Sequence, residues 1–258
     1  MSIRPKKSLG QHFLKDTNMI EKITDAIEAD ASDRIIEIGP GTGELTAALI
    51  RRFDNVVAVE LDQRAVAVLR EKFPGLEVIH SDILDIDFGH IAEEKARTHV
   101  IGNLPYYITS QILFLLLANR HLLADALLMM QKEVAERLVA PIRTKDYGIL
   151  SVQTQLMSSP EILFDVPREV FSPQPNVDSA MVRLAFDKGV LACSDVHLKT
   201  VVRTAFNQRR KKLSNALKPV VDKKQQPSGF DFDKRAEAWE PGMYEKLTAR
   251  LEENGILT

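Results

Sequence analysis

Arg34-Ile-Ile-Glu-Ile-Gly-Pro-Gly-Thr-Gly43 decides the fold, because a predicted strand over Arg34–Ile38 runs directly into a glycine-rich turn. The periodicity that follows predicts a helix from Glu44 to about Phe53. Gly39, Gly41 and Gly43 let the backbone turn tightly and approach a ligand. A helix that starts there points its free N–H groups and the positive end of its dipole at the same ligand. The stretch therefore predicts a strand–turn–helix unit with a ligand at its turn.

Similar segments alternate along most of the chain. Further strands are predicted at Asn55–Leu61, Leu76–His80, His99–Ile101, Ala126–Met130, Glu161–Val166 and Ala180–Phe186. Helices are predicted over Asn18–Ala29 with Asn18 as N-cap, and over Arg64–Phe73, Gln111–Ala118, Lys132–Val139 and Gly148–Met157. This alternation is typical of the α/β class, with a doubly wound, mostly parallel sheet covered on both faces.

The pattern changes near residue 189. Beyond it the sequence predicts no strands, only amphipathic helices, notably over Leu198–Leu217 and Met243–Asn254. We therefore expect a sheet-containing domain over residues 1–188, which begins with a basic arm or loop over residues 1–17, and a smaller helical domain over residues 189–258.

Glu60 indicates the kind of ligand. It closes the second strand 21 residues after Gly39, where a carboxylate can accept hydrogen bonds from ribose hydroxyls. This spacing alone does not separate a nicotinamide dinucleotide from S-adenosylmethionine. A dinucleotide site, however, has glycine at the position of Glu44, and an acid there would repel a pyrophosphate. S-adenosylmethionine carries an ammonium group and no phosphate, so Glu44 favours it.

Polar residues also follow the next two strands. Asp82 could accept the exocyclic amine of an adenine while Ile83 packs on the ring, although on its own Asp82 is more simply a helix cap. In Asn103-Leu-Pro-Tyr106, Pro105 must stop sheet pairing, Asn103 offers an acceptor oxygen and Tyr106 a stacking face. Strand ends of an open parallel sheet meet in one crevice, so we expect these groups and the glycine turn to lie together.

Charge is unevenly distributed along the chain. The net charge is -2, but Lys199–Lys224 carries +8 and the remainder sums to -10. The basic groups singled out as RNA contacts are Lys6 and Lys7 near the N-terminus and Arg209, Arg210, Lys211 and Lys212 in a predicted helix. Two basic segments on an acidic body are typical of binding to a phosphate backbone, and the alternative is a solvated helix face.

Composition excludes several classes of protein. The chain has 258 residues, of which 45% are hydrophobic and 27% charged, as in ordinary globular proteins. Its longest apolar run, Ile112–Ala118, is far short of the ~20 residues that cross a bilayer. Cys193 is the single cysteine, so the chain has no intrachain disulfide and no cysteine cluster for zinc or iron. We expect a cytoplasmic protein without a metal, acting as a monomer.

Five motifs together resemble the ribosomal RNA adenine N6-dimethyltransferases, most closely the bacterial branch that acts on 16S rRNA. They are Ser8-Leu-Gly-Gln-His-Phe-Leu14, Glu37-Ile-Gly-Pro-Gly-Thr-Gly43, Asn103-Leu-Pro-Tyr106, Phe171-Ser-Pro-Gln-Pro-Asn-Val-Asp-Ser179 and Ala205-Phe-Asn-Gln-Arg-Arg-Lys-Lys-Leu-Ser-Asn215. The resemblance implies a class I S-adenosylmethionine-dependent methyltransferase fold with an antiparallel last strand and a helical C-terminal domain that binds RNA. It implies as substrate two adjacent adenosines in a 3′-terminal hairpin loop of 16S rRNA, within the small subunit or its precursor, each methylated twice.

The resemblance also implies roles for individual residues. The cofactor contacts would be His12, Leu14, Gly39, Gly41, Glu60, Leu61, Asp82, Ile83 and Asn103. Asn103 and Leu104 would orient the target amine, Pro105 would fix the turn, and Tyr106 and Phe171 would enclose the adenine. Position 12 is asparagine in some relatives, and without its motif Phe171 would be an ordinary loop anchor.

Three alternatives stay open at this point. A nicotinamide oxidoreductase has no use for Asn-Leu-Pro-Tyr. A related methyltransferase acting on 23S rRNA, of the antibiotic-resistance type, or on DNA would share the catalytic core. A non-catalytic assembly factor for the small subunit would need the same basic surface.

Overall fold

A computed structural model of the chain describes residues 5–6, 10–92 and 96–257. The chain divides into two compact units, Met1–Ala135 with Glu161–Phe186, and Glu136–Pro160 with Asp187–Thr258. The division expected from sequence differs in placing Glu136–Pro160 with the sheet. No helix in the described ranges is long and apolar enough to cross a membrane.

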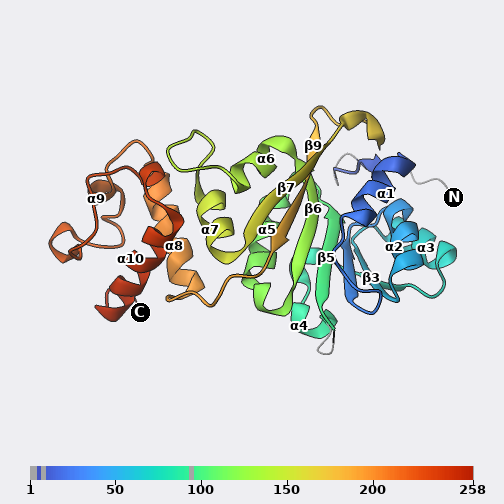
Figure 1. Cartoon of the computed structure of the whole chain (residues 1–258), viewed down its shortest axis with the longest axis horizontal. Coiled ribbons are helices and arrows are strands. Elements are labelled where there is room, and N and C mark those ends of the chain that lie inside the picture. Colours follow the sequence, from blue (N-terminus) through green and yellow to red (C-terminus); the bar gives the residue numbers. More distant parts are fainter. Residues whose placement is uncertain (1–4, 7–9, 93–95, 258) are drawn as a thin grey trace. The chain divides into compact units, whose positions relative to one another are not determined.

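A seven-stranded sheet forms the centre of the first unit (Figure 1). Its order is β4-β3-β2-β5-β6-β9-β7, with β2 to β6 parallel and β9 antiparallel to β6. The strands are β2 (Arg34–Ile38), β3 (Asn55–Glu60), β4 (Glu77–His80), β5 (Thr98–Asn103), β6 (Asp125–Gln131), β7 (Ser159–Val166) and β9 (Ser179–Ala185). The strand order reverses between β2 and β5, and at such a switch point the carboxyl ends of the strands open a crevice.

The central strands are buried on both faces. Successive residues of β2, β3, β5 and β6 are buried almost without interruption, whereas a strand with one solvated face would alternate. The helices of this unit are α1 (Thr17–Asp25), α2 (Glu44–Arg52), α3 (Gln63–Lys72), α4 (Phe88–Ile91) and α5 (Thr109–Ala118), and α6 (Lys132–Leu138) begins in it. The 3-10 turns are η2 (Ile83–Asp85), η3 (Arg120–Leu122) and η4 (Arg168–Val170).

Two sequence expectations about the N-terminal part were wrong. Helix α1 begins one residue earlier than predicted, and its N-cap is Asp16, whose carboxylate accepts from the Met19 N–H at 2.7 Å. The segment before it is not wholly irregular, because β1 (Phe13–Leu14) pairs antiparallel with β8 (Phe171–Ser172). The pairing joins residues some 160 positions apart, and Leu14 and Phe171 are buried in the core.

The second unit is helical, with an aromatic core. It contains α7 (Ile149–Met157), α8 (Asp195–Asn207), α9 (Leu213–Ala216), α10 (Pro241–Glu253) and the 3-10 turns η5 (Lys223–Gln225) and η6 (Ala236–Ala238). Tyr147, Phe206, Trp239 and Tyr244 form successive ring contacts with centroids 5.5 to 6.0 Å apart. The buried Tyr147 and Tyr244 hydroxyls donate to the carbonyls of Trp239 and Ala236.

The long helix predicted over Leu198–Leu217 is wrong. Helix α8 ends at Asn207, and Arg209–Lys212 form a turn before the short α9. Arg209 holds this turn, because its guanidinium bonds to Glu237 and to the carbonyls of Thr144 and Lys145 at 2.7 to 2.9 Å. Arg209 is therefore a structural residue of the second unit.

Candidate active site

The predicted crevice is present in the first unit. The turn after β2, the ends of β3 and β5 and the residues after β4 line one cavity. Its lining includes the predicted residues His12, Leu14, Gly39, Gly41, Glu60, Leu61, Asp82, Ile83, Asn103, Leu104, Pro105 and Tyr106, together with Gln11, Phe13, Glu37, Glu44 and Tyr107. The structure thus brings every predicted cofactor residue to one place.

The glycine turn has the left-handed backbone that its three glycines permit. Gly39, Gly41 and Gly43 have φ angles of 66°, 58° and 83°, in the left-handed region that other residues rarely adopt. The Gly41 N–H donates to Glu60 at 3.0 Å, so the turn is fixed to the end of β3. A Cβ at Gly41 would lie 2.8 Å from the ring of Phe13, which shows how closely the N-terminal segment covers the turn.

Gly41→Ala should weaken binding of the cofactor that the sequence predicts by about tenfold or more. Alanine favours a turn relaxed out of the left-handed region by roughly 1–2 kcal/mol, and binding would have to restore that backbone against Phe13. Isothermal titration of S-adenosylmethionine measures the change. Gly75→Ala is the matched control, since a Cβ at Gly75 meets nothing within 4 Å. Equal affinities for the two variants would show that the turn is not part of the cofactor site.

Two buried glutamates lie beneath the turn. Glu60 is 6% exposed, and its two oxygens accept from the backbone N–H groups of Gly41 and Asp62 at 3.0 and 2.8 Å. Burial raises the pKa of Glu60 despite these bonds. Burial also raises the pKa of Glu37 to about 8, although the Thr46 hydroxyl donates to it at 2.6 Å. A cationic ligand in the cavity would favour the ionised form of both groups.

Asp82 has the capping role that its sequence position suggested. Its Oδ1 accepts from the Leu84 N–H at 3.0 Å and starts the 3-10 turn η2. A carboxylate has about four acceptor positions, so this bond does not prevent Asp82 from also accepting from a ligand in the cavity that it lines.

The Asn103-Leu-Pro-Tyr106 segment forms the wall beyond β5. The Asn103 side-chain Nδ2 donates to the backbone carbonyl of His12 at 2.9 Å. This bond assigns the nitrogen of the amide to His12 and leaves Oδ1 as the acceptor. The Tyr106 hydroxyl bonds to Ser179 at 2.9 Å, and its ring stacks with that of His12 at 5.7 Å between centroids.

Phe171 does not lie where the sequence predicted, on the opposite face of a target adenine from Tyr106. Its side chain is 5% exposed, belongs to the core beside Leu14 and does not line the cavity. The pairing of β1 with β8 turns Phe171 into the core instead of toward Tyr106. The predicted sandwich of an adenine between Tyr106 and Phe171 therefore has no support in this structure.

Polar contacts that the sequence did not predict hold the N-terminal segment, which lines the cavity, to other parts of the chain. His12 Nδ1 donates to the Pro173 carbonyl at 2.7 Å. Gln11 donates to Asp62 at 3.2 Å, and Lys6, one of the predicted RNA contacts, pairs with Asp62 at 3.7 Å. Hydrogen bonds from Arg64 hold the pKa of Asp62 well below its usual range, so it stays ionised. Lys7 lies outside the described residues.

The mostly parallel sheet with antiparallel β9, the glycine turn and the acidic residue that ends β3 make the first unit a Rossmann-like fold of the kind found in S-adenosylmethionine-dependent methyltransferases. A model of the ribosomal RNA adenine dimethylase family matches residues 3–238. The chain belongs to that family.

Curated relatives and solved structures agree with this assignment. The chain is 48% identical to ribosomal RNA small subunit methyltransferase A of Salinibacter ruber, over 96% of this chain and 86% of the relative. It is 42% identical to the protein of the same name from Porphyromonas gingivalis, over 98% and 100%. A dimethyladenosine transferase from Plasmodium falciparum superposes with a TM-score of 0.79 at 26% identity, over 95% and 98% of the two chains. The 23S rRNA methyltransferase ErmE superposes with 0.68 at 27% identity, over 93% and 99%.

These findings confirm the predicted fold class and family. They also confirm the predicted class of enzyme, an S-adenosylmethionine-dependent rRNA adenine dimethyltransferase. The alternative hypothesis of a nicotinamide oxidoreductase is disfavoured by the same findings.

Proposed function

We propose that this protein transfers methyl groups from S-adenosylmethionine to N6 of two adjacent adenosines in a 3′-terminal hairpin loop of 16S rRNA, in the small subunit or its precursor. The observation that carries the proposal is the placing of Asn103 and Tyr106 in the same cavity as the glycine turn and Glu60. A methyl acceptor and a methyl donor can therefore meet there. The small-subunit assignment is supported by the names of relatives aligned over nearly the whole chain.

The residues present fit S-adenosylmethionine. The Glu60 carboxylate makes one hydrogen bond through each oxygen to the backbone and keeps acceptor positions for ribose hydroxyls. Ile83 and the 44% exposed Leu61 offer apolar contact for an adenine ring. Glu44, which accepts from Lys15 at 2.7 Å, suits an ammonium group, and Glu37 would ionise when such a cation binds beside it. When bound, this cofactor supplies an electrophilic methyl group.

Asn103 would orient the acceptor amine. The lone pair of an adenine amine is delocalised into the ring, so the nitrogen is a poor nucleophile. If Asn103 Oδ1 and the Leu104 carbonyl accept its two N–H groups, the nitrogen becomes more pyramidal and its lone pair points at the methyl group. No strong base is needed, because alkylation makes the nitrogen far more acidic and positioning provides most of the rate.

Tyr106 would hold the target adenine, which must leave its stack to reach the cavity. The bond from its hydroxyl to Ser179 fixes the ring at the cavity wall. Burial raises the pKa of Tyr106, so the phenol stays neutral and keeps this bond.

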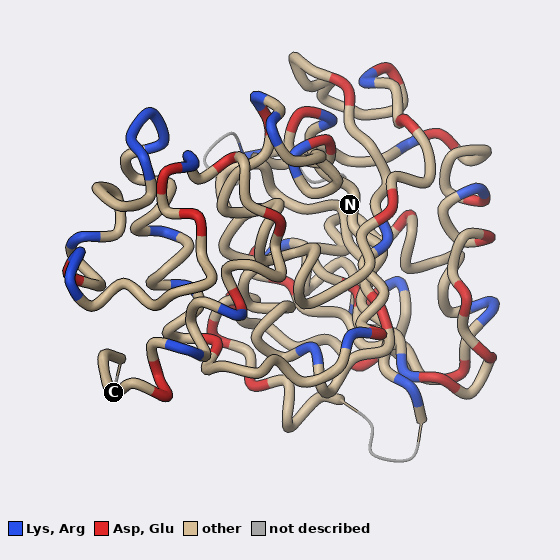
Figure 2. Tube along the Cα trace, turned by 60° about the vertical axis from the view of Figure 1, so that its left-hand side comes forward, with Lys and Arg blue, Asp and Glu red and all other residues tan. Residues whose placement is uncertain are grey.

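The second unit would provide the phosphate contacts. Lys and Arg positions recur along its loops (Figure 2), and Arg210, Lys211 and Lys212 are exposed in the turn after α8. Lys212 pairs with Asp233 at 3.0 Å but remains 58% exposed. Of the four cations that the sequence singled out here, we retain these three, because Arg209 is used within the unit.

Replacing Arg210, Lys211 and Lys212 by Gln should weaken RNA binding and reduce its salt dependence. Three lost phosphate contacts lower the slope of log K against log salt concentration by about 2 to 3. Filter binding of 16S rRNA at several salt concentrations measures the slope, and S-adenosylmethionine affinity should not change. Arg250→Gln, on α10 of the same unit, is the control. An unchanged slope would remove this turn from the RNA-binding surface.

The proposed function is tested directly with small subunits from cells that lack this methylation. Incubation with the protein and labelled cofactor should yield two dimethyladenosines in the 3′-terminal hairpin, read by mass spectrometry of the rRNA fragment. A parallel incubation with large subunits tests the alternative, because transfer to 23S rRNA instead would favour the antibiotic-resistance type of enzyme. Binding of the particles without any transfer would favour an assembly factor.

A further inference from the structure

An exposed aromatic side chain stands at the mouth of the cavity and has no role in the reaction described above. Tyr107 lines the cavity and is 57% exposed. Exposed tyrosines with an apolar ring and a polar tip are enriched where proteins bind partners. Tyr107 follows Tyr106 directly, so whatever holds the target base brings Tyr107 near the rest of the RNA.

The backbone separates the two tyrosines. The Ile108 N–H donates to the Pro105 carbonyl at 3.2 Å and closes a turn over residues 105–108. Tyr106 is half-buried with its hydroxyl on Ser179, whereas the Tyr107 hydroxyl has no hydrogen-bond partner in the described part of the chain. The hydrogen bond to Ser179 thus fixes Tyr106 at the cavity wall, whereas the exposed side chain of Tyr107 can contact a ligand.

Gly10 places the N-terminal segment against Tyr107. A Cβ at Gly10 would lie 3.4 Å from Cδ1 of the Tyr107 ring, and Gly10 has a φ of 58°. The N-terminal segment therefore lies beside one side of the ring, and more than half of the Tyr107 side chain is exposed to solvent. A partly fixed aromatic ring loses little entropy when a flat partner stacks on it.

We propose that Tyr107 is a positioning residue that stacks on the adenine next to the one being methylated. This inference rests on the proposed function, in which two adenosines are adjacent. Moving one adenine into the cavity removes a stacking neighbour from the other, and the Tyr107 ring replaces that neighbour. The same contact would then serve when the two bases exchange places for the second adenosine.

Steady-state kinetics with undermethylated small subunits test the proposal. Tyr107→Ala should raise KM for the particles by about tenfold, the range of one base–aromatic stack, with kcat and the Kd for S-adenosylmethionine changed less than about twofold. Tyr107→Phe should restore the wild-type KM, because it keeps the ring. Val196→Ala, at an exposed position of the second unit, is the control.

A cycle of substitutions across the protein and the RNA distinguishes stacking from a structural role. Two particle preparations each carry uridine, a weaker stacking base, in place of one of the two adenosines. For at least one of these particles, the KM of wild-type protein should be as high as that of Tyr107→Ala on the natural particle. On that same altered particle, Tyr107→Ala should raise KM little further. Additive effects on both particles, or an unchanged KM for Tyr107→Ala on the natural particle, would overturn the proposal. If wild-type protein transfers no methyl group to natural particles, the proposed function itself fails.

Discussion

Replacing Asn103 by Ala should lower kcat for methyl transfer by about 100- to 1000-fold, the effect typical of removing one preorganised polar contact to the reacting group. The amide Nδ2 is bonded to the His12 carbonyl at 2.9 Å, so Oδ1 has a fixed direction before substrate arrives. Alanine removes the acceptor that turns the amine toward the methyl group. Single-turnover transfer to small subunits, with S-adenosylmethionine affinity measured separately, isolates the chemical step.

Asn119→Ala is the matched control for this variant. Asn119 makes the same kind of bond, from Nδ2 to the Leu115 carbonyl at 2.9 Å, but at the end of α5 and outside the cavity lining. Loss of the Asn119 amide should leave the rate of methyl transfer within about twofold of the wild-type rate. Asn103→Asp should be intermediate at best, because it keeps an acceptor but sets a carboxylate oxygen against the His12 carbonyl. Full transfer by Asn103→Ala at unchanged cofactor affinity would contradict the proposed mechanism.

The sequence was informative where local pattern and tertiary structure agree. β2 was predicted with its observed bounds, because five consecutive strand-like residues end at glycines with positive φ. The crevice followed from topology, since residues at the ends of parallel strands must meet. The role of each residue in that crevice is still a proposal.

Pairings between distant segments could not be predicted in this way. β1 and β8 have two residues each, too few to show a period, and their pairing decides where Phe171 points. In the sequence, the helical period of α8 continues to Leu213, because apolar positions seven or eight apart fit one helix face, although a turn intervenes in the structure. Arg209 is held in this turn by hydrogen bonds to Glu237 and Thr144. Both partners are distant in sequence, so the end of α8 could not be predicted from the local pattern.

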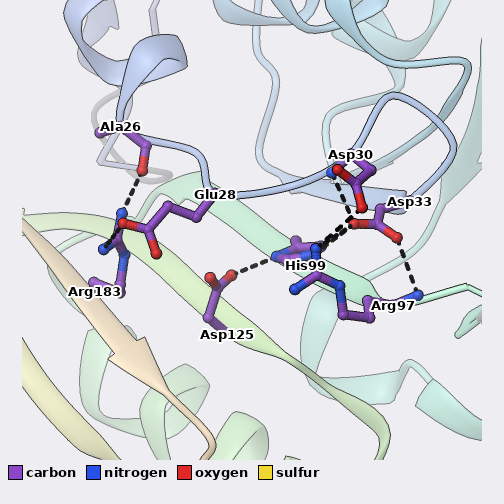
Figure 3. Close-up of polar contacts among 8 residues, drawn as sticks. All are labelled: Ala26, Glu28, Asp30, Asp33, Arg97, His99, Asp125 and Arg183. Atoms are coloured by element: carbon purple, nitrogen blue, oxygen red, sulfur yellow. Dashed lines mark hydrogen bonds and ion pairs between the residues drawn. The ribbon is translucent and has the colours of Figure 1, made fainter.

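Asp33→Asn should lower the free energy of unfolding by about 2 to 4 kcal/mol at neutral pH. The substitution removes one charged member of a buried cluster and leaves its partners without the carboxylate that they face. Asp33, Arg97, His99 and Asp125 lie at the amino ends of the central strands (Figure 3). Asp33 is 5% exposed and accepts from the Asp30 N–H at 2.9 Å and from the Arg97 guanidinium at 3.1 Å. His99 lies between two carboxylates, with Nδ1 2.8 Å from Asp125 and Nε2 3.3 Å from Asp33.

The effect should depend on pH in a defined direction. Burial alone would raise the pKa of Asp33, but the Asp30 N–H, Arg97 and His99 outweigh it and lower that pKa below its ordinary value. A carboxylate with a lowered folded-state pKa adds stability that is fully present above its unfolded pKa of about 4 and is lost as the pH falls through the folded-state value. At neutral pH the Tm of Asp33→Asn should thus be lower than that of wild type by on the order of 5 to 10 °C, and this difference should narrow below about pH 4.

Asp30→Asn is the control that distinguishes the loss of a buried carboxylate from the loss of an exposed one. Asp30 pairs with the same Arg97 guanidinium at 3.6 Å, but its side chain is 83% exposed, so solvent screens the pair. Thermal unfolding of this variant should differ from wild type by less than about 1 kcal/mol at every pH. If Asp30→Asn and Asp33→Asn lose equal stability, Arg97 alone would account for the effect. A larger loss for Asp33→Asn that narrows in acid would show that the buried carboxylate facing His99 stabilises the amino ends of β2 and β5, opposite the ends that carry the cavity.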